Sequence, residues 1–203
     1  MTTLKKHPDW FYDFYPMEIL LLGSFPPHSS KHAFPFYYPN KQNRFWKILA
    51  HIANKTLTHD LSNTELAVNE RKNLMKFLHI GIHDVGKTIF RKNNSSLDTK
   101  IDIIEYQDIK KIVKNHPELQ QILLLGFSSK NSATQTFIKY LEHQKIVAEF
   151  PVDFKLKSQQ SFSIFIDNRK IKCTILNSTS SASAIGIDAL IDQFSKYILV
   201  PNE

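Results

Sequence analysis

The stretch "EILLLGS", from Glu18 to Ser24, decides the fold that this sequence predicts. An unbroken aliphatic run that ends in glycine and is soon followed by Pro26 is typical of a short strand buried on both faces, as in a parallel sheet. The pattern returns in "QILLLGFSS", from Gln121 to Ser129, and a helical pattern follows each run further along the chain. Strands that alternate with helices predict an α/β fold with right-handed crossovers.

Apolar residues at helical spacing predict the helices. These are expected from Asn43 onward, from the capping-box pair Ser62 and Glu65 to about His79, and over 105–115, 131–143 and 187–199. "GIHDVG" (81–86) is expected to be a short strand or turn, and alternating segments on both sides of Asn168-Arg169 predict a β-hairpin. We therefore expect one domain over residues 1–203, a three-layer α/β/α sandwich with a central, mainly parallel sheet of about four strands.

The composition is that of an ordinary globular protein with a basic surface. The chain has 203 residues, 42% of them hydrophobic, and a single cysteine, Cys173. One cysteine excludes a disulfide framework, a CxxC zinc site and a four-cysteine iron–sulfur cluster. No apolar run reaches the ~20 residues that cross a bilayer, and the N-terminus lacks the apolar core of a signal peptide, so we expect a cytoplasmic protein. The net charge of +7 favours a polyanionic partner only weakly.

Small polar loops follow three of the predicted strands, at the edge where α/β sheets bind their ligands. They begin at Gly23, Gly126 and Asn177. The first loop continues into a segment rich in proline and aromatic residues, "GSFPPHSSKHAFPFYYPNKQNRFW" (23–46), and the third belongs to "LNSTSSASA" (176–184). The GxSxG, Walker A and GxGxxG motifs are absent, which argues against an unrelated α/β hydrolase or nucleotide-binding protein.

Together these two motifs resemble the uracil-DNA glycosylase superfamily, and most closely its hypoxanthine-DNA glycosylase branch. That branch has a pattern like GSMPG…YY…P-x-N-x-FW, which is matched here by Gly23-Ser24-Phe25-Pro26, by Tyr37-Tyr38, and by Asn43 with Phe45-Trp46. "GIHDV…RKNNSSLDTKI" is similar to its GI-x-x-WDV…R-x-GSLDS-x-I segment, with Asp98 in the place of its aspartate. The resemblance extends from about Ile19 to Phe194 and implies a uracil-DNA glycosylase-like fold.

The sequence departs from that pattern at several positions. Pro27 replaces a glycine, and His83 replaces a tryptophan. In the second motif, Asn177 and Ser181 stand where the branch has prolines, and Ser183 stands where it has asparagine. A loop without its prolines is less preorganised. The water-activating aspartate of the uracil-specific branch is missing as well, because "SFPP" contains no acid.

The resemblance implies a catalytic role for Asn43, whose amide can hold a water through its oxygen or donate to the base through its nitrogen. By residue type alone, an asparagine ahead of an apolar helical pattern is more often an N-cap. Further residues are candidates for contact with substrate and DNA. The substrate-binding candidates are Gly23, Ser24, Phe25, Pro26, Tyr37 and Tyr38; the DNA-binding candidates are Ser178, Thr179, Ser180 and Ser181; Asp98 is a candidate loop anchor.

Structural interpretations compete with these roles. The aromatic residues could belong to the core or anchor the loop, and the serines could form a solvated turn. His83 and Asp84 could pair as a base and its orienter or serve structure alone. Lys41, Arg44 and Lys47 could contact phosphates or form an ordinary solvated face.

The resemblance implies a monofunctional DNA glycosylase that flips out a deaminated base, hypoxanthine or uracil, and hydrolyses its N-glycosidic bond in base-excision repair. No lysine lies within the matched motifs where a Schiff base would be expected, and Lys41 is the nearest exception. The expected partner is DNA with a damaged or deaminated base, bound by a monomer without metal, cofactor or membrane. The alternative is a non-catalytic member of the same fold that binds nucleic acid or a nucleobase.

Overall fold

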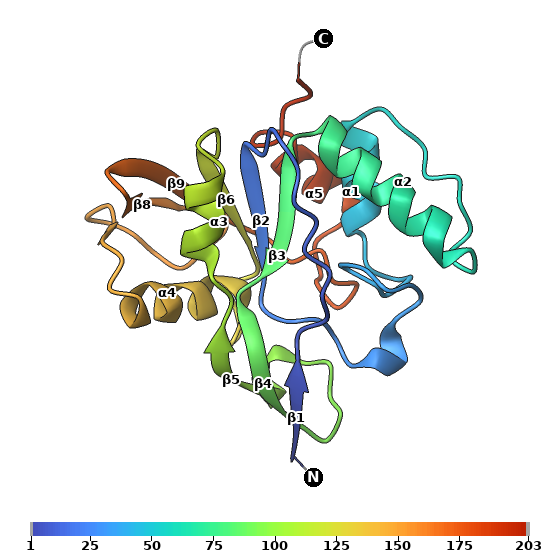
Figure 1. Cartoon of the computed structure of the whole chain (residues 1–203), viewed down its shortest axis with the longest axis horizontal. Helices are drawn as coiled ribbons and strands as arrows, with labels where there is room; N and C mark the ends of the chain where they lie inside the picture. Colours follow the sequence, from blue (N-terminus) through green and yellow to red (C-terminus); the bar gives the residue numbers. More distant parts are fainter. Residues whose placement is uncertain (1, 202–203) are drawn as a thin grey trace.

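The computed structural model describes residues 2–201, and a six-stranded sheet lies at its centre (Figure 1). The strand order is β3-β2-β6-β9-β8-β7. The strands are β2 (Ile19–Gly23), β3 (Ile80–Asp84), β6 (Gln121–Leu125), β7 (Ala148–Glu149), β8 (Ser161–Ile166) and β9 (Arg169–Leu176). β3, β2, β6 and β9 pair in parallel, whereas β8 and β7 join in antiparallel pairs. The α/β class is confirmed, but the expected sheet of about four strands is wrong, because the sheet is mixed and has six.

The additional strands follow from the hairpin of β8 and β9. Its turn is formed by Asp167 and Asn168, one residue earlier than predicted, with φ angles of +50° and +61°. Two consecutive positive φ angles are typical of a type I′ turn, and aspartate and asparagine adopt them more readily than Arg169 would. The hairpin reverses the chain, so β8 must lie antiparallel to β9.

A second, antiparallel sheet was not expected from the sequence. It has the order β1-β4-β5, with bounds Thr2–Lys6, Gly86–Lys92 and Ile101–Tyr106. β5 includes the first residues of the predicted 105–115 helix, and α3 begins only at Ile109. The side chain of Asp108 accepts the backbone N–H of Lys111 at 2.9 Å, and this cap fixes the start of the helix.

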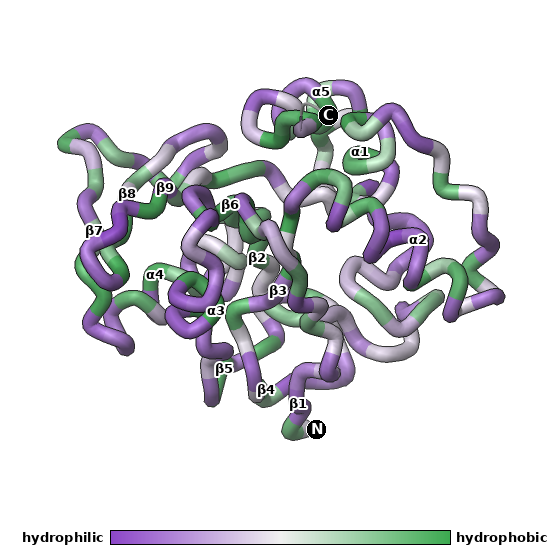
Figure 2. The backbone as a smooth tube through the Cα atoms, turned by 45° about the horizontal axis from the view of Figure 1, so that its top comes forward, coloured by the Kyte–Doolittle hydropathy of each residue, from purple (hydrophilic) through white to green (hydrophobic). Residues whose placement is uncertain are grey.

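Helices lie on both sides of the central strands, with α3 and α4 on one side and α1, α2 and α5 on the other (Figure 1). The helices are α1 (Phe45–Ile52), α2 (Thr64–Phe77), α3 (Ile109–Asn115), α4 (Ala133–His143) and α5 (Ile187–Phe194). Leu20, Leu21 and Leu22 of β2 are 0% exposed, as expected for a strand covered on both faces. Figure 2 shows hydrophobic residues along β2 and β6 in the middle of the molecule.

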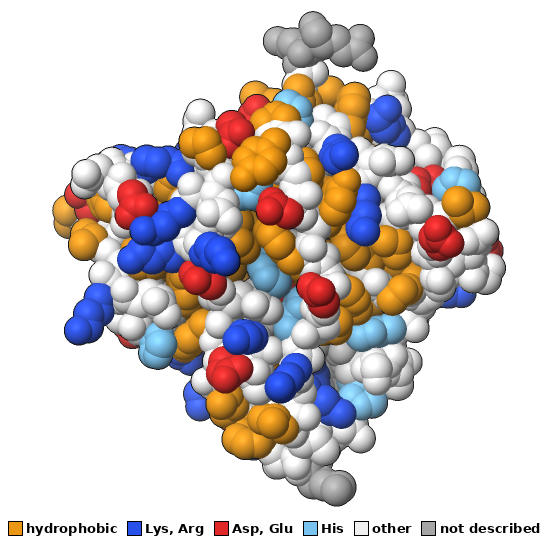
Figure 3. All heavy atoms as spheres, in the orientation of Figure 1, with side chains coloured by type: hydrophobic (Ala, Val, Ile, Leu, Met, Phe, Trp, Pro, Cys, Tyr) orange, Lys and Arg blue, Asp and Glu red, His pale blue; other side chains and the backbone are white. Residues whose placement is uncertain are grey.

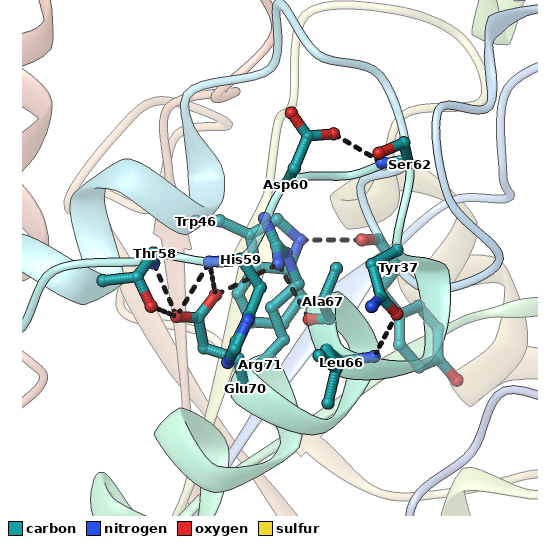
Figure 4. Close-up of polar contacts among 11 residues, drawn as sticks. Tyr37, Trp46, Thr58, His59, Asp60, Ser62, Leu66, Ala67, Glu70 and Arg71 are labelled. Atoms are coloured by element: carbon teal, nitrogen blue, oxygen red, sulfur yellow. Dashed lines mark hydrogen bonds and ion pairs between the residues drawn. The ribbon is translucent and has the colours of Figure 1, made fainter.

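The proline-rich segment and the loop before α2 are both tied to helices (Figure 4). The indole Nε1 of Trp46 in α1 donates to the carbonyl of Tyr37 at 2.8 Å. A carboxylate oxygen of Glu70 in α2 accepts the backbone N–H of Thr58 at 2.6 Å and its hydroxyl at 3.1 Å. The first of these bonds fixes the backbone of the aromatic segment against α1.

The N-cap of α2 is Asn63 and not the predicted Ser62. The side-chain oxygen of Asn63 accepts the backbone N–H of Leu66 at 3.4 Å. Serine and asparagine are both good N-cap residues, and Asn63, which lies one position closer to the helix, is the N-cap. Over residues 2–201, none of the helices has the length and apolar character needed to cross a membrane.

Candidate functional site

The carboxyl ends of the parallel strands meet the start of α1, and segments distant in sequence lie together there. Ser24, directly after β2, donates its hydroxyl to Asp98 Oδ1 at 2.6 Å. Thr179, after β9, donates its hydroxyl to Asn43 Oδ1 at 2.9 Å. The structure therefore joins the motifs that the sequence placed at separate strand ends, and we call this region the strand-end site.

Asn43 is oriented by two hydrogen bonds to its side-chain oxygen. Oδ1 accepts the backbone N–H of Phe45 at 2.9 Å as well as the Thr179 hydroxyl. A backbone N–H can only donate, so the oxygen of the amide must face it, and both oxygen lone pairs are in use. Within residues 2–201 no acceptor is found for Nδ2, which remains able to donate to a ligand. The N-cap position of α1 itself belongs to Arg44.

The candidate DNA-binding residues differ in their exposure. Ser181 is exposed, and Ser178 and Ser180 are half-buried. The side chain of Thr179 is buried, with 1% exposure, and its hydroxyl is used by Asn43. The hydroxyl of Ser178 accepts the N–H of Ser180 at 3.2 Å, which forms a local turn. Three of the four side chains thus remain accessible, while Thr179 links the loop to Asn43.

Gly23 is required by its neighbours in the protein. A Cβ at this position would lie 2.1 Å from Asp84 Oδ1 and 3.4 Å from the Tyr38 hydroxyl. Asp84 is held in place by His7, whose Nε2 lies 3.0 Å from Asp84 Oδ2. Within residues 2–201 the buried Tyr38 hydroxyl has no hydrogen-bond partner, and burial raises the pKa of Tyr38 well above its usual range. A buried polar group without a partner is uncommon in native proteins, which marks this hydroxyl beside the end of β2 as a candidate for a functional role.

Phe25 and Pro26 are held by Arg91. Nη2 of Arg91 donates to the carbonyl of Pro26 at 2.6 Å, and its guanidinium lies 5.6 Å from the centre of the Phe25 ring. Phe25 also contacts His7 edge-to-face, with ring centres 5.6 Å apart. The half-buried ring is therefore fixed on one side while part of its surface remains accessible.

His83 and Asp84 do not form the pair that their sequence suggested, because neighbours in β3 point to opposite faces. His83 Nδ1 lies 2.9 Å from the Tyr37 hydroxyl, and burial, with His7 nearby, lowers the pKa of His83 to about 3. Tyr37 is 1% exposed, so it supports the site from the interior. His7 was missed by the sequence analysis, since nothing local connects a histidine in "KKHP" with an aspartate 77 residues away.

Asp98, the candidate loop anchor, forms hydrogen bonds to two other segments at the strand-end site. Its carboxylate accepts the Ser24 hydroxyl, and its carbonyl accepts Nδ2 of Asn131 at 3.3 Å. The pKa of Asp98 is raised to about 6, mainly by burial and also by nearby Asp84, against the opposing effects of Ser24 and Arg91. The carboxyl therefore changes its charge close to neutral pH.

This raised pKa predicts a pH dependence of stability. The folded protein binds the Asp98 proton more tightly than the unfolded chain does, so the free energy of unfolding falls as pH rises from about 4 to about 6. Asp98→Asn retains an acceptor for Ser24 and removes this fall, which we expect to be about 1–2 kcal/mol. Urea denaturation of both proteins at pH 4, 5, 6 and 7 measures the difference, with the exposed Asp153→Asn as a matched control. Parallel stability curves for wild type and Asp98→Asn would contradict it.

Charges of both signs are mixed on the face that Figure 3 shows, and no metal centre is evident within residues 2–201. Lys and Arg are scattered among Asp and Glu over the face in Figure 3. In residues 2–201, no three His, Cys, Asp or Glu side chains are grouped so that they could hold a metal ion.

The fold of this chain is similar to that of a solved structure. A solution NMR structure from Methanosarcina acetivorans, named as a candidate uracil DNA glycosylase, superposes with a TM-score of 0.60 over 96% of each chain. The two sequences are 20% identical, so this match shows a shared fold.

The sequence itself is similar to a particular relative. It is 31% identical over 109 residues to a hypoxanthine DNA glycosylase of Methanosarcina acetivorans. The match covers 54% of this chain and 63% of the relative, so the chain spans less than two thirds of that protein. No family model matches the chain. The resemblance to the uracil-DNA glycosylase superfamily, and to its hypoxanthine branch, is therefore confirmed.

Proposed function

We propose that this chain is a single-domain, monofunctional DNA glycosylase that excises a deaminated base, hypoxanthine or uracil, in base-excision repair. The observation that carries the proposal is the orientation of Asn43 at the strand-end site. Its oxygen is fully occupied by Phe45 and Thr179, and its amide nitrogen remains available to a ligand. Asn43, to which the resemblance assigns the catalytic position, can thus donate a hydrogen bond from Nδ2 to a ligand.

Hydrolysis of an N-glycosidic bond needs a donor at the departing base. Water adds to C1′ of the sugar, the bond to the base nitrogen breaks, and the base leaves with the electron pair and takes up a proton. Negative charge therefore develops on the base, and a preorganised N–H aimed at it stabilises the transition state. In this proposal Nδ2 of Asn43 is that donor. The reaction consumes only water as a co-substrate, and the proposal assigns no step to a metal or cofactor.

The other residues of the strand-end site bind the substrate in this proposal. Phe25 stacks on the flipped base, a contact that contributes ~1–3 kcal/mol per base. Tyr38 offers its unpartnered hydroxyl to the base, and Tyr37 supports this wall from beneath. The Gly23-Ser24-Phe25-Pro26 turn forms the floor. Asp98 anchors the loop through Ser24.

Ser178, Ser180 and Ser181 contact DNA phosphates in this proposal, because short hydroxyls and backbone N–H groups can donate hydrogen bonds to phosphate oxygens. In this proposal Thr179 does not contact DNA, because its hydroxyl donates to Asn43. The monomeric state and the cytoplasmic location remain predictions.

The alternative, a non-catalytic module that binds nucleic acid, is favoured by one feature, the loss of two prolines from the 177–183 loop. Base excision separates the two functions. Labelled oligonucleotides with one uracil, hypoxanthine or xanthine, single- and double-stranded, are incubated with the protein and then treated with alkali. We expect cleavage at the modified base after alkali only. Binding without alkali-sensitive sites would favour the alternative, and cleavage without alkali would overturn the monofunctional assignment.

A further inference from the structure

The guanidinium of Arg44 binds the backbone of the loop after β9, although a charge at this position was expected to face phosphate or solvent. Nε donates to the Thr179 carbonyl at 3.3 Å, and Nη2 donates to the carbonyls of Ser180 at 2.5 Å and Ser183 at 3.4 Å. Nη1 donates to the carbonyl of Ile185. One side chain thus binds four carbonyls of the segment 179–185, which we call the 179–185 loop.

This position is electrostatically unfavourable for an arginine unless the loop is present. Arg44 is the N-cap residue of α1, where the helix dipole disfavours a positive charge. None of the ion pairs found within residues 2–201 includes it. The carbonyl oxygens of the 179–185 loop supply the compensating negative ends of dipoles. The arrangement indicates that the loop and the arginine depend on each other.

The 179–185 loop has few other means of keeping one conformation. It consists of serine, threonine and alanine up to Ile185, without the prolines that the resemblance led us to expect nearby. Ordering such a segment costs about 1–2 kcal/mol of backbone entropy per residue. The planar guanidinium, with five N–H donors in a fixed fork, can bind several carbonyls at once and offset part of that cost.

The loop in turn orients Asn43. Thr179 is bound by Arg44 through its carbonyl, which also accepts the backbone N–H of Arg44 at 3.1 Å. The hydroxyl of the same threonine donates to Asn43 Oδ1 at 2.9 Å. A continuous set of hydrogen bonds therefore runs from the Arg44 guanidinium through Thr179 to the amide of Asn43.

We propose that Arg44 is a positioning residue, which holds the 179–185 loop so that Thr179 fixes the Asn43 amide with Nδ2 towards the substrate. This inference rests on the proposed glycosylase function for its effect on rate. Its effect on the loop is independent of that function, because the four carbonyl contacts exist without DNA. Hydrogen exchange of the 179–185 loop therefore tests the role of Arg44, and base excision separately tests the glycosylase function.

Arg169 offers a matched control. Its guanidinium also binds four backbone carbonyls, those of Val113, His116, Pro117 and Leu119, at 2.6–3.1 Å. The Val113 carbonyl belongs to α3 and the other three belong to the connection between α3 and β6, and none of the four is part of the strand-end site. Arg44→Met and Arg169→Met remove equivalent sets of hydrogen bonds, but only the first one loosens a loop connected to Asn43.

The experiment compares these two variants with Thr179→Val, which deletes the donor to Asn43 and leaves the arginine in place. Hydrogen exchange is measured by mass spectrometry for the peptide that contains the 179–185 loop. Single-turnover excision and oligonucleotide binding are measured on the substrate that wild type prefers. Arg44→Met should raise exchange in the loop roughly tenfold or more, because charge-assisted hydrogen bonds are lost. It should slow excision about a hundredfold, the scale for a misplaced catalytic group, with a smaller change in binding.

Thr179→Val should slow excision on the same scale without raising exchange in the loop. Arg169→Met should raise exchange only between α3 and β6 and leave excision within about threefold of wild type. Unchanged exchange in the 179–185 loop of Arg44→Met would overturn the inference, whether or not wild type excises a base. Equal losses of excision in Arg44→Met and Arg169→Met would overturn it as well. If Arg44→Met does not fold, Arg44→Lys replaces it, and wild-type exchange and excision in Arg44→Lys would then overturn the inference.

Discussion

Asn43→Asp is expected to lower the rate of base excision by at least about 100-fold, the scale for losing one preorganised donor to a transition state. Aspartate keeps an oxygen for the backbone N–H of Phe45 and the hydroxyl of Thr179, so both observed hydrogen bonds survive. It replaces Nδ2 by a second acceptor, which would repel the negative charge that develops on the base. Single-turnover excision by the two proteins, at matched occupancy of the oligonucleotide, measures the effect.

A comparison with two further variants separates chemistry from stability. Asn43→Ala also removes the hydrogen bond to the backbone N–H of Phe45 and should cost about 0.5–1.5 kcal/mol of stability, whereas Asn43→Asp should unfold close to wild type. Asn69→Asp adds the same negative charge on an exposed face of α2 and should excise normally. Excision by Asn43→Asp that equals or exceeds the wild-type rate would show that Asn43 acts through its oxygen, by holding the water.

Gly23→Ala is the second variant for which a large effect is expected. The new Cβ would lie 2.1 Å from Asp84 Oδ1, and this carboxylate cannot move freely because His7 holds its other oxygen. Overpacking of this kind costs about 1–3 kcal/mol of stability. The displacement of β3 against β2 should also misplace the loop of Ser24 and Phe25, and lower excision about 100-fold.

Gly186→Ala is the matched control for this change. A Cβ on Gly186 meets no atom within 4 Å, and its φ of −64° suits any residue. Thermal unfolding and excision of the three proteins give the comparison. If Gly23→Ala were as stable and as active as Gly186→Ala, Asp84 would have to be mobile, and its fixed pairing with His7 would be wrong.

The central strands could be predicted because their signal is local. Runs such as Ile19-Leu20-Leu21-Leu22 must be buried on both faces, and burial on both faces implies helices on both sides of a sheet. The three-stranded sheet had no such signal. Four of the five residues of β1 are exposed, so its polar sequence shows no alternation, and only pairing with β4 makes it a strand.

The sequence indicated candidate residues of the strand-end site, but it did not indicate the hydrogen bonds between them. The sequence placed the loops of Ser24 and Thr179 at strand ends, and the resemblance made Asn43 and Asp98 candidates; the structure shows Ser24 bonded to Asp98 and Thr179 bonded to Asn43. Which atom of Asn43 faces Thr179 depends on a contact across 136 residues. The role of Arg44 was hidden for the same reason, because its acceptors are backbone carbonyls and carry no sequence signature.

The most direct measurement is the release of free base by the wild-type protein. Single- and double-stranded oligonucleotides with one hypoxanthine or one uracil are incubated with the protein, and the small-molecule fraction is separated and identified by mass spectrometry. A monofunctional glycosylase must yield the free base in an amount equal to the abasic sites, with the DNA strand intact, and Asn43→Asp must yield at least about 100-fold less per unit time. No free base from any of these substrates, from a folded protein that binds the oligonucleotides, would contradict the glycosylase function and leave a nucleic-acid-binding module.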